Sequence, residues 1–170
     1  MKIVVSGGTG LIGRMLVQDL AGDGHDVVVL SRSPKKYGDM FGENVCLVYW
    51  DGRNIGEWVN QTDGADAVVY LAGESISGSS FLPDRWSAEK KQHVLESRLA
   101  AGEALAKAIE AADSKPDVLL QASAVGYYGS TGDALITESS PLGDDFLASV
   151  TVRRPLTQLK LWVCAVPLLV

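Results

Sequence analysis

Short apolar runs alternate along the chain with stretches in which apolar residues recur every three or four positions. The runs are rich in Val, Ile and Leu and lack the strict polar–apolar alternation of a half-exposed strand. They predict buried parallel strands over residues 2–6, 26–31, 45–49, 67–71 and 117–122. Because strands alternate with helical stretches, we expect an α/β protein with a doubly wound parallel sheet, the Rossmann fold.

Helices are predicted between these runs. The first follows residue 10 and ends at Gly22 and Gly24, and the second runs from a Ser87 N-cap to about residue 112. A short helix is expected at residues 56–61 and another from Asp145, while residues 78–84 predict a loop. The faces expected to be buried are Ile12, Leu16 and Leu20 beside Met15 in the first helix, and Leu95, Leu99, Ala106 and Ile109, flanked by Leu105, in the second.

A glycine turn joins the first strand to the first helix. Its glycines fit two registers: Gly8, Gly10 and Gly13 give G-x-G-x-x-G, and Gly7 with the last two gives G-x-x-G-x-x-G. Glycine permits a tight turn and a close backbone approach to a pyrophosphate, which then faces the free N–H groups of the helix. The spacing, with a strand before it and a helix after it, therefore favours a dinucleotide site over a tight turn without a ligand.

The ends of the next strands supply further candidates. The second strand is followed by Ser31 and Arg32, with lysines close by and no acid, which favours NADP over NAD; the alternative is an exposed basic loop. Asp51, after the third strand, is a candidate for the border of the adenine site. Gly73 and Glu74 come just after the fourth strand, where ligands bind in open α/β sheets.

The composition limits the remaining classes. The chain has 170 residues, 46% of them hydrophobic, and a net charge of −6, which argues against a nucleic-acid or anionic-membrane surface. No apolar run approaches the roughly 20 residues of a membrane span, and the first strand begins too early for a signal peptide. Cys46 and Cys164 have no metal-ligand spacing, and we expect Cys46 to be a small core residue. We expect a cytoplasmic protein with a small-molecule substrate, and a homodimer.

Several strings together resemble a known family. They are the glycine turn Ser-Gly-Gly-Thr-Gly-Leu-Ile-Gly, Leu-Ala-Gly-Glu at residues 71–74, Arg-Trp at 85–86, Glu-Ser-Arg at 96–98, and Ser-Ala-Val-Gly-Tyr-Tyr-Gly at 123–129. The chain resembles the extended short-chain dehydrogenase/reductase superfamily and, within it, the NAD(P)-dependent epimerase/dehydratase-like group. The resemblance implies NADP(H) and assigns cofactor contacts to Gly7, Gly8, Thr9, Gly10, Leu11, Ile12, Gly13, Ser31, Arg32, Leu71, Ala72 and Arg98.

The resemblance also places catalysis after the fifth strand. It sets Ser123 beside the reacting carbon. Tyr127 or Tyr128 are candidates for the acid, and the alternative is that both residues shape the turn. Ordinary members need a Tyr-x-x-x-Lys pair for proton transfer, and this chain has no tyrosine after Tyr128. The resemblance implies an enzyme that transfers hydride on a sugar nucleotide or similar molecule. The missing pair favours the alternatives, a non-catalytic nucleotide-binding protein or an inactive truncated product.

The last twenty residues depart from the family pattern. We expect an NADP-binding domain over residues 1–150, an atypical tail over 151–170, and no C-terminal substrate domain. The apolar run near the end is either a sixth strand at residues 163–166 or the product of a shifted reading frame. The second hypothesis predicts a tail that does not pair with the sheet.

Overall fold

The computed structural model describes residues 1–76, 86–153 and 162–168. Its centre is one six-stranded parallel sheet with the strand order β3-β2-β1-β4-β5-β6. The strands are β1 (Lys2–Ser6), β2 (Asp26–Ser31), β3 (Val45–Tyr49), β4 (Ala67–Tyr70), β5 (Val118–Ala124) and β6 (Trp162–Leu168). The order reverses between β1 and β4, as in a doubly wound sheet, so the predicted Rossmann fold is confirmed. The predicted loop at residues 78–84 lies outside the described residues.

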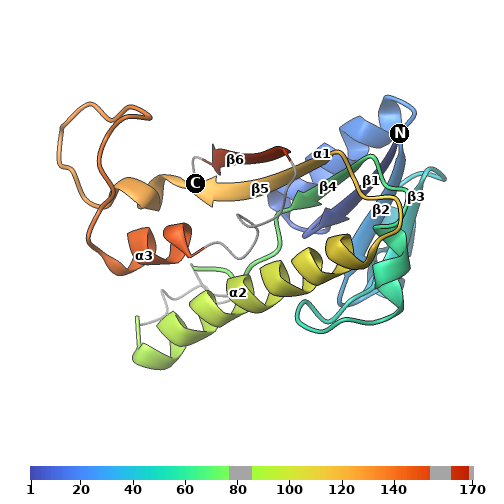
Figure 1. The fold of residues 1–170 in the computed structure, drawn as a ribbon, viewed down its shortest axis with the longest axis horizontal. Helices are drawn as coiled ribbons and strands as arrows, with labels where there is room; N and C mark the ends of the chain where they lie inside the picture. Colours follow the sequence, from blue (N-terminus) through green and yellow to red (C-terminus); the bar gives the residue numbers. More distant parts are fainter. Residues whose placement is uncertain (77–85, 154–161, 169–170) are drawn as a thin grey trace.

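Helices cover both faces of the sheet (Figure 1). The helix α1 (Leu11–Gly22) packs on one face through Val17, which is fully buried against valines of β1 and β2. The long helix α2 (Ala88–Ala111) packs on the other face, and its N-cap Ser87 accepts a hydrogen bond from the Lys90 N–H, as predicted. Each face of the sheet thus has its own hydrophobic core, and both cores consist largely of β-branched and other aliphatic side chains. This composition suits strands that are buried on two sides.

Shorter helices complete the connections. They are the 3-10 helices η1 (Pro34–Met40), η2 (Glu57–Gln61) and η3 (Val125–Tyr128), and the α-helix α3 (Phe146–Val152). The helix α3 starts where the sequence predicted, because the Asp145 carboxylate accepts a hydrogen bond from the Ala148 N–H at 2.8 Å and so caps the helix.

The buried faces of the two main helices agree with the prediction in part. In α1 Leu16 and Leu20 pack against the core as predicted, whereas Ile12 and Met15 are exposed. The fully buried residues are Gly13, which lies down on the glycine turn, and Val17. In α2 Ile109 is buried and Ala106 packs against the core, as predicted. Leu105 lies at the centre of the buried face rather than at its flank, and small residues pack beside it: Ala101, Gly102, Ala104 and Ala108.

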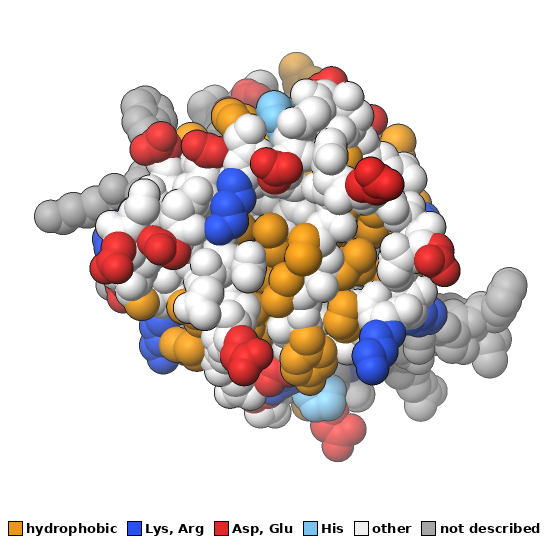
Figure 2. Space-filling view, turned by 90° about the vertical axis from the view of Figure 1, so that its right-hand side faces the viewer, with side chains coloured by type: hydrophobic (Ala, Val, Ile, Leu, Met, Phe, Trp, Pro, Cys, Tyr) orange, Lys and Arg blue, Asp and Glu red, His pale blue; other side chains and the backbone are white. Residues whose placement is uncertain are grey.

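The strand β3 forms one edge of the sheet, and its side chains are only partly covered. Cys46 is exposed there, so its prediction as a core residue was wrong. Figure 2 shows this side of the molecule, where hydrophobic side chains gather near the centre with acidic side chains around them. The homodimer stays a prediction. Within the described residues, no helix is long and apolar enough to cross a membrane.

The tail from residue 151 contributes a strand. The strand β6 pairs with β5 in parallel from Trp162, opposite Val118, to Leu168, opposite Ala124. The strand expected at residues 163–166 therefore lies within β6, which is longer than expected. A shifted reading frame predicts that this segment stays out of the sheet, and the origin of the tail stays a prediction. Pro167 fits there because an edge strand tolerates a residue without an N–H.

A glycine substitution in α1 tests the close packing of this helix on the turn. In Gly13→Ala the new Cβ would overlap the Gly7 carbonyl oxygen and come within 2.7 Å of the Gly8 Cα, both of them backbone atoms. We expect the free energy of unfolding to fall by about 1–3 kcal/mol or more, since a packed backbone cannot make room cheaply. Urea unfolding followed by circular dichroism measures it.

Gly22→Ala is the matched control, because no atom lies within 4 Å of its added Cβ. Alanine is the better helix former, so this variant is expected to be unchanged or more stable by up to about 1 kcal/mol. Equal effects of the two substitutions would contradict the packing argument.

Candidate dinucleotide-binding site

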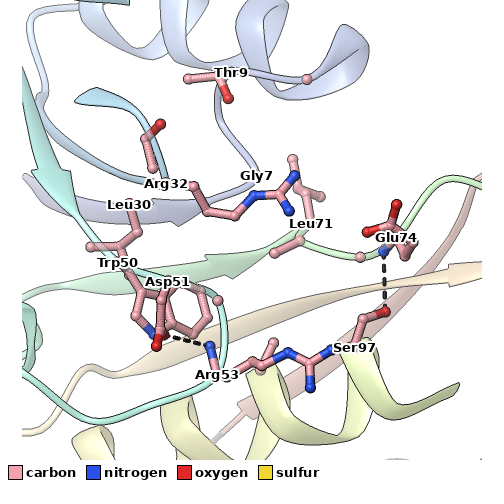
Figure 3. A pocket seen from close by; sticks show the side chains of 16 residues that line it. Gly7, Thr9, Leu30, Arg32, Trp50, Asp51, Arg53, Leu71, Glu74 and Ser97 are labelled. Carbon is pink, nitrogen blue, oxygen red and sulfur yellow. Dashed lines mark hydrogen bonds between the residues drawn. The ribbon is translucent and has the colours of Figure 1, made fainter. Parts of the chain in front are cut away.

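A cavity of about 280 Å³ opens at the carboxyl ends of the first four strands, beside the point where the strand order reverses (Figure 3). Such a position is where open α/β sheets bind their ligands. The cavity is lined by Gly7, Thr9, Gly10, Leu30, Ser31, Arg32, Trp50, Asp51, Gly52, Arg53, Leu71, Ala72, Gly73, Glu74, Ser97 and Ala101. The glycine turn, the Ser31–Arg32 pair and the end of the fourth strand therefore meet in one place, as the sequence predicted.

The glycines of the turn have different structural roles. Gly7 has a φ of +78°, and a Cβ there would lie 2.8 Å from the Ala72 nitrogen, so this residue lets the turn approach the end of β4. A Cβ on Gly8 would lie 2.9 Å from the Val29 Cγ1, so glycine lets the turn pack on β2. At Gly10, by contrast, an added Cβ meets only the Gly7 carbonyl oxygen, at 3.2 Å, and otherwise faces open space. Gly10 is therefore the position where lack of a side chain leaves room for a ligand.

The start of α1 offers hydrogen-bond donors to that ligand. Gly10 is the N-cap of α1, and no side chain caps the helix. Its own N–H bonds to the Gly7 carbonyl at 3.0 Å, and the Arg14 N–H returns to the Gly10 carbonyl at 2.9 Å. The N–H groups of residues 11–13 have no intrahelical partner, and with the helix dipole they favour a phosphate. The side chains of Leu11 and Ile12 are exposed at this end.

The turn after β2 carries Arg32 into the cavity. Ser31 is buried, and its Oγ accepts a hydrogen bond from the Ser33 N–H at 3.2 Å, which shapes the turn. In Figure 3 the Arg32 side chain crosses the cavity with its guanidinium near Gly7 and Leu71. No carboxylate stands at this strand end to accept a ribose 2′-OH, so the position suits a 2′-phosphate.

Asp51 lines the cavity, but its oxygens are engaged within its own loop. The carboxylate accepts hydrogen bonds from the N–H groups of Arg53 and Asn54, both at 2.8 Å, and from the Asn54 side chain at 2.7 Å. The backbone donors from Asn54 and Arg53 hold the pKa of Asp51 below its usual value. Asp51 therefore fixes the loop at the border of the cavity, and its place beside adenine stays a prediction.

The helix α2 holds the loop that follows β4. The Ser97 Oγ accepts a hydrogen bond from the Glu74 N–H at 3.2 Å, and Arg98 donates to the Glu74 carbonyl at 3.1 Å. A Cβ on Gly73 would lie 3.1 Å from the Arg98 Cζ, so glycine lets the guanidinium pack against the loop. Burial lowers the pKa of Arg98, and the neighbouring Tyr70 and Glu74 oppose this shift. Arg98, expected to contact the cofactor, is not among the residues that line the cavity.

The expected catalytic residues lie at the neighbouring strand end. Ser123 is within β5 rather than after it, and Tyr127 and Tyr128 belong to η3, with ring centroids 5.1 Å apart. Because β5 is next to β4 and parallel to it, Ser123 stands at the same edge of the sheet as residues 71–74. The three residues do not line the cavity described above.

Sequence reasoning missed Leu30, Trp50, Gly52, Arg53, Ser97 and Ala101. The Trp50 indole packs on Trp58 with centroids 4.9 Å apart, and both indole N–H groups donate to the Asn54 carbonyl at 3.0 Å. In the string Trp-Asp-Gly-Arg-Asn the Asp side chain can accept a hydrogen bond from the backbone N–H two residues later. This Asp is the one signal in the sequence for a fixed turn that carries Arg53.

The parallel sheet, the glycine turn and the cavity above it define a Rossmann-type NAD(P)-binding protein. The sequence model of the NAD dependent epimerase/dehydratase family matches residues 3–149, which end near the predicted boundary at residue 150. The chain belongs to this family, as the resemblance implied.

Individual relatives agree with this assignment. The chain is 39% identical over 155 residues to "Epimerase family protein SDR39U1 homolog, chloroplastic" of Arabidopsis thaliana, covering 88% of this chain and 42% of the relative. It is 36% identical over 149 residues to "Epimerase family protein YfhF" of Bacillus subtilis, covering 87% and 46%. The chain thus spans less than half the length of these relatives.

Solved structures show the same fold. The crystal structure of human epimerase family protein SDR39U1 (isoform 2) with NADPH superposes with a TM-score of 0.70 at 35% identity, covering 89% of this chain and 46% of that one. A crystal structure of UDP-glucose 4-epimerase, at 22% identity, reaches a TM-score of 0.71, which supports the fold alone.

The hydrogen bond from the Tyr70 hydroxyl to the Arg98 carbonyl, 2.6 Å long, ties β4 to α2. Tyr70→Phe should lower the free energy of unfolding at pH 7 by about 1 kcal/mol, since one buried hydrogen bond is lost. Burial raises the pKa of Tyr70 above its ordinary value of 10.0, so the phenol ionises more readily in the unfolded chain. The wild type therefore loses stability as the pH rises above 10.0, whereas Tyr70→Phe has no phenol to ionise at this position. The difference in the free energy of unfolding between the two proteins should shrink over this range.

Urea unfolding of both proteins at pH 7, 10 and 11 measures this difference. A constant difference across the series would contradict the burial-raised pKa, and no difference at pH 7 would contradict the hydrogen bond.

Proposed function

We propose that the chain binds NADP(H) through this cavity, as the cofactor half of an epimerase or oxidoreductase. The observation that carries the proposal is the pairing of an uncapped α1 terminus at Gly10 with Arg32 on the neighbouring strand end. The first suits a pyrophosphate and the second a 2′-phosphate. The NADPH in the structure of the human relative supports the same preference for this chain.

The residues of the chain have distinct parts in this proposal. Gly10 leaves room for the pyrophosphate, the N–H groups of residues 11–13 donate to it, and Arg32 pairs with the 2′-phosphate. When bound, the cofactor supplies a nicotinamide ring that accepts or donates hydride. Ser123, with Tyr127 or Tyr128, stands at the adjacent strand end, where a substrate such as a sugar nucleotide would be held for proton transfer.

The alternative is a nucleotide-binding protein without turnover. It is favoured by the absence of a Tyr-x-x-x-Lys pair, and the three catalytic candidates are not among the residues that line the cavity. Incubation with NADP⁺ and a panel of sugar nucleotides distinguishes the two. The absorbance of NADPH reports net oxidation, and chromatography of the sugar nucleotides reports epimerisation, which leaves the cofactor unchanged overall. A product by either readout supports the enzyme, and binding without product supports the alternative.

Cofactor choice tests the role of Arg32. Calorimetry should show that NADPH binds the unmodified chain more tightly than NADH. Arg32→Asp should lower the affinity for NADPH by about 10- to 100-fold and change the affinity for NADH little. Lys35→Asp is the matched control, because it makes the same charge change on a neighbouring exposed residue that does not line the cavity. Equal losses in both variants would instead indicate an exposed basic loop with no specific contact.

Gly10→Val tests the site of the pyrophosphate. The added side chain would enter the open space above the turn, so the protein should fold normally and lose NADPH and NADH affinity together. Gly42→Val, where nothing lies within 4 Å and which is outside this cavity, is the control and should bind normally. A folded Gly10→Val protein with unchanged affinity would place the dinucleotide elsewhere.

A further inference from the structure

Arg53 is a second cation at the cavity, and neither the sequence nor the family pattern assigned it a part. Figure 3 shows Arg32 and Arg53 on opposite sides of the cavity, with the Arg53 guanidinium lying toward Ser97 of α2. The Asp51 carboxylate attracts Arg53, while its hydrogen bonds come from the N–H groups of Arg53 and Asn54 and from the Asn54 side chain. The Arg53 side chain is exposed and lines the cavity, so a planar cation faces the ligand space.

The loop that carries Arg53 is held at several points. Asp51 accepts hydrogen bonds from the N–H groups of Arg53 and Asn54, and the Asn54 carbonyl accepts from the indoles of Trp50 and Trp58. Because Trp50 and Trp58 are both buried, this anchor belongs to the core. Arg53 is thus presented from a fixed backbone, which reduces the entropy lost when it contacts a ligand.

The order of the strands indicates which part of a dinucleotide Arg53 would meet. The glycine turn follows β1, Arg32 follows β2, and Arg53 follows β3, which lies beyond β2. Neighbouring strands are about 4.8 Å apart, so Arg53 stands roughly 10 Å along the sheet from the pyrophosphate position. With the pyrophosphate at β1 and the ribose at β2, the next group outward is the adenine.

The chemistry of the wall also fits a base. Trp50, Leu30, Ala72 and Ala101 give the cavity an apolar wall, although the Trp50 ring also packs on Trp58. The Arg53 guanidinium adds a planar surface that stacks well on the face of a nucleobase. We propose that Arg53 stacks on the adenine ring, with Asp51 as its positioning residue, and so supplies affinity common to NADPH and NADH. This proposal rests on the proposed function.

Calorimetry with NADPH and NADH tests it on the wild type, Arg53→Gln, Arg53→Lys and Arg32→Gln. Arg53→Gln should lower the affinity for NADPH and for NADH by about 5- to 30-fold each, so that the ratio of the two affinities is unchanged. Arg32→Gln should reduce the affinity for NADPH relative to that for NADH. Arg53→Lys should recover little of the affinity that is lost in Arg53→Gln, because an ammonium group keeps the charge but not the planar surface. Thermal unfolding checks that each variant is folded.

The outcomes separate this inference from the proposed function. A wild type that binds neither nucleotide would overturn both. A wild type that binds, with Arg53→Gln unchanged, would overturn the adenine contact alone. A loss confined to NADPH, or full recovery in Arg53→Lys, would also overturn it, because either result would show that Arg53 acts as a charge on the 2′-phosphate.

A double-mutant cycle tests the positioning by Asp51. Asp51→Ala should lower the affinity for NADH in the wild-type background. It should lower that affinity no further in the Arg53→Gln background. Additive losses would overturn the positioning role, because a general loosening of the loop would act whether or not Arg53 is present.

Discussion

The close approach of three backbone segments at the glycine turn determines where this molecule can bind a ligand. Gly7 lies against Leu71 and Ala72 at the end of β4, and Gly13 brings the first turn of α1 down onto Gly7 and Gly8. A side chain at either position would push the helix or the strand away. The contact therefore fixes the helix terminus over the point where the strand order reverses, and the exposed donors of α1 face the cavity as a consequence.

The outer walls of the cavity are held by side chains that do not themselves need to touch a ligand. Ser97 and Arg98 of α2 bond to the backbone of Glu74, and Asp51 bonds to the backbone of Arg53 and Asn54. An acidic chain can thus present a basic pair, Arg32 and Arg53, because both carboxylates of the lining have partners of their own: Asp51 within its loop and Glu74 at Arg98. This arrangement reconciles a net charge of −6 with a site suited to a polyanionic cofactor.

Sequence patterns predicted most of this fold for identifiable reasons. Buried parallel strands are continuous apolar runs, and Gly7 to Gly13 identify the turn between a strand and a helix. The faces of α1 and α2 were predicted in part. Large side chains such as Ile109 are buried as expected, but the close contacts of Gly13 and of the alanines between 101 and 108 are not visible in the spacing of large apolar residues. The sixth strand was hard to predict because its apolar run follows a helix-breaking Arg-Arg-Pro string, and only its pairing with β5 identifies it as a strand. In the site, the position of Arg53 comes from a loop whose hydrogen bonds are not visible in composition or spacing.

The central claim is that NADPH lies on the glycine turn with its phosphates at the start of α1. Amide chemical-shift mapping on ¹⁵N-labelled protein, titrated with NADPH, tests this most directly. The account predicts saturable shifts for the amides of Gly10 to Gly13, Arg32 and Ala72. It also predicts unchanged amides at Phe41 to Asn44, which line a separate hollow beside the last turn of α1 and the start of β3. Shifts confined to that hollow, or no saturable shift in the glycine turn, would contradict it.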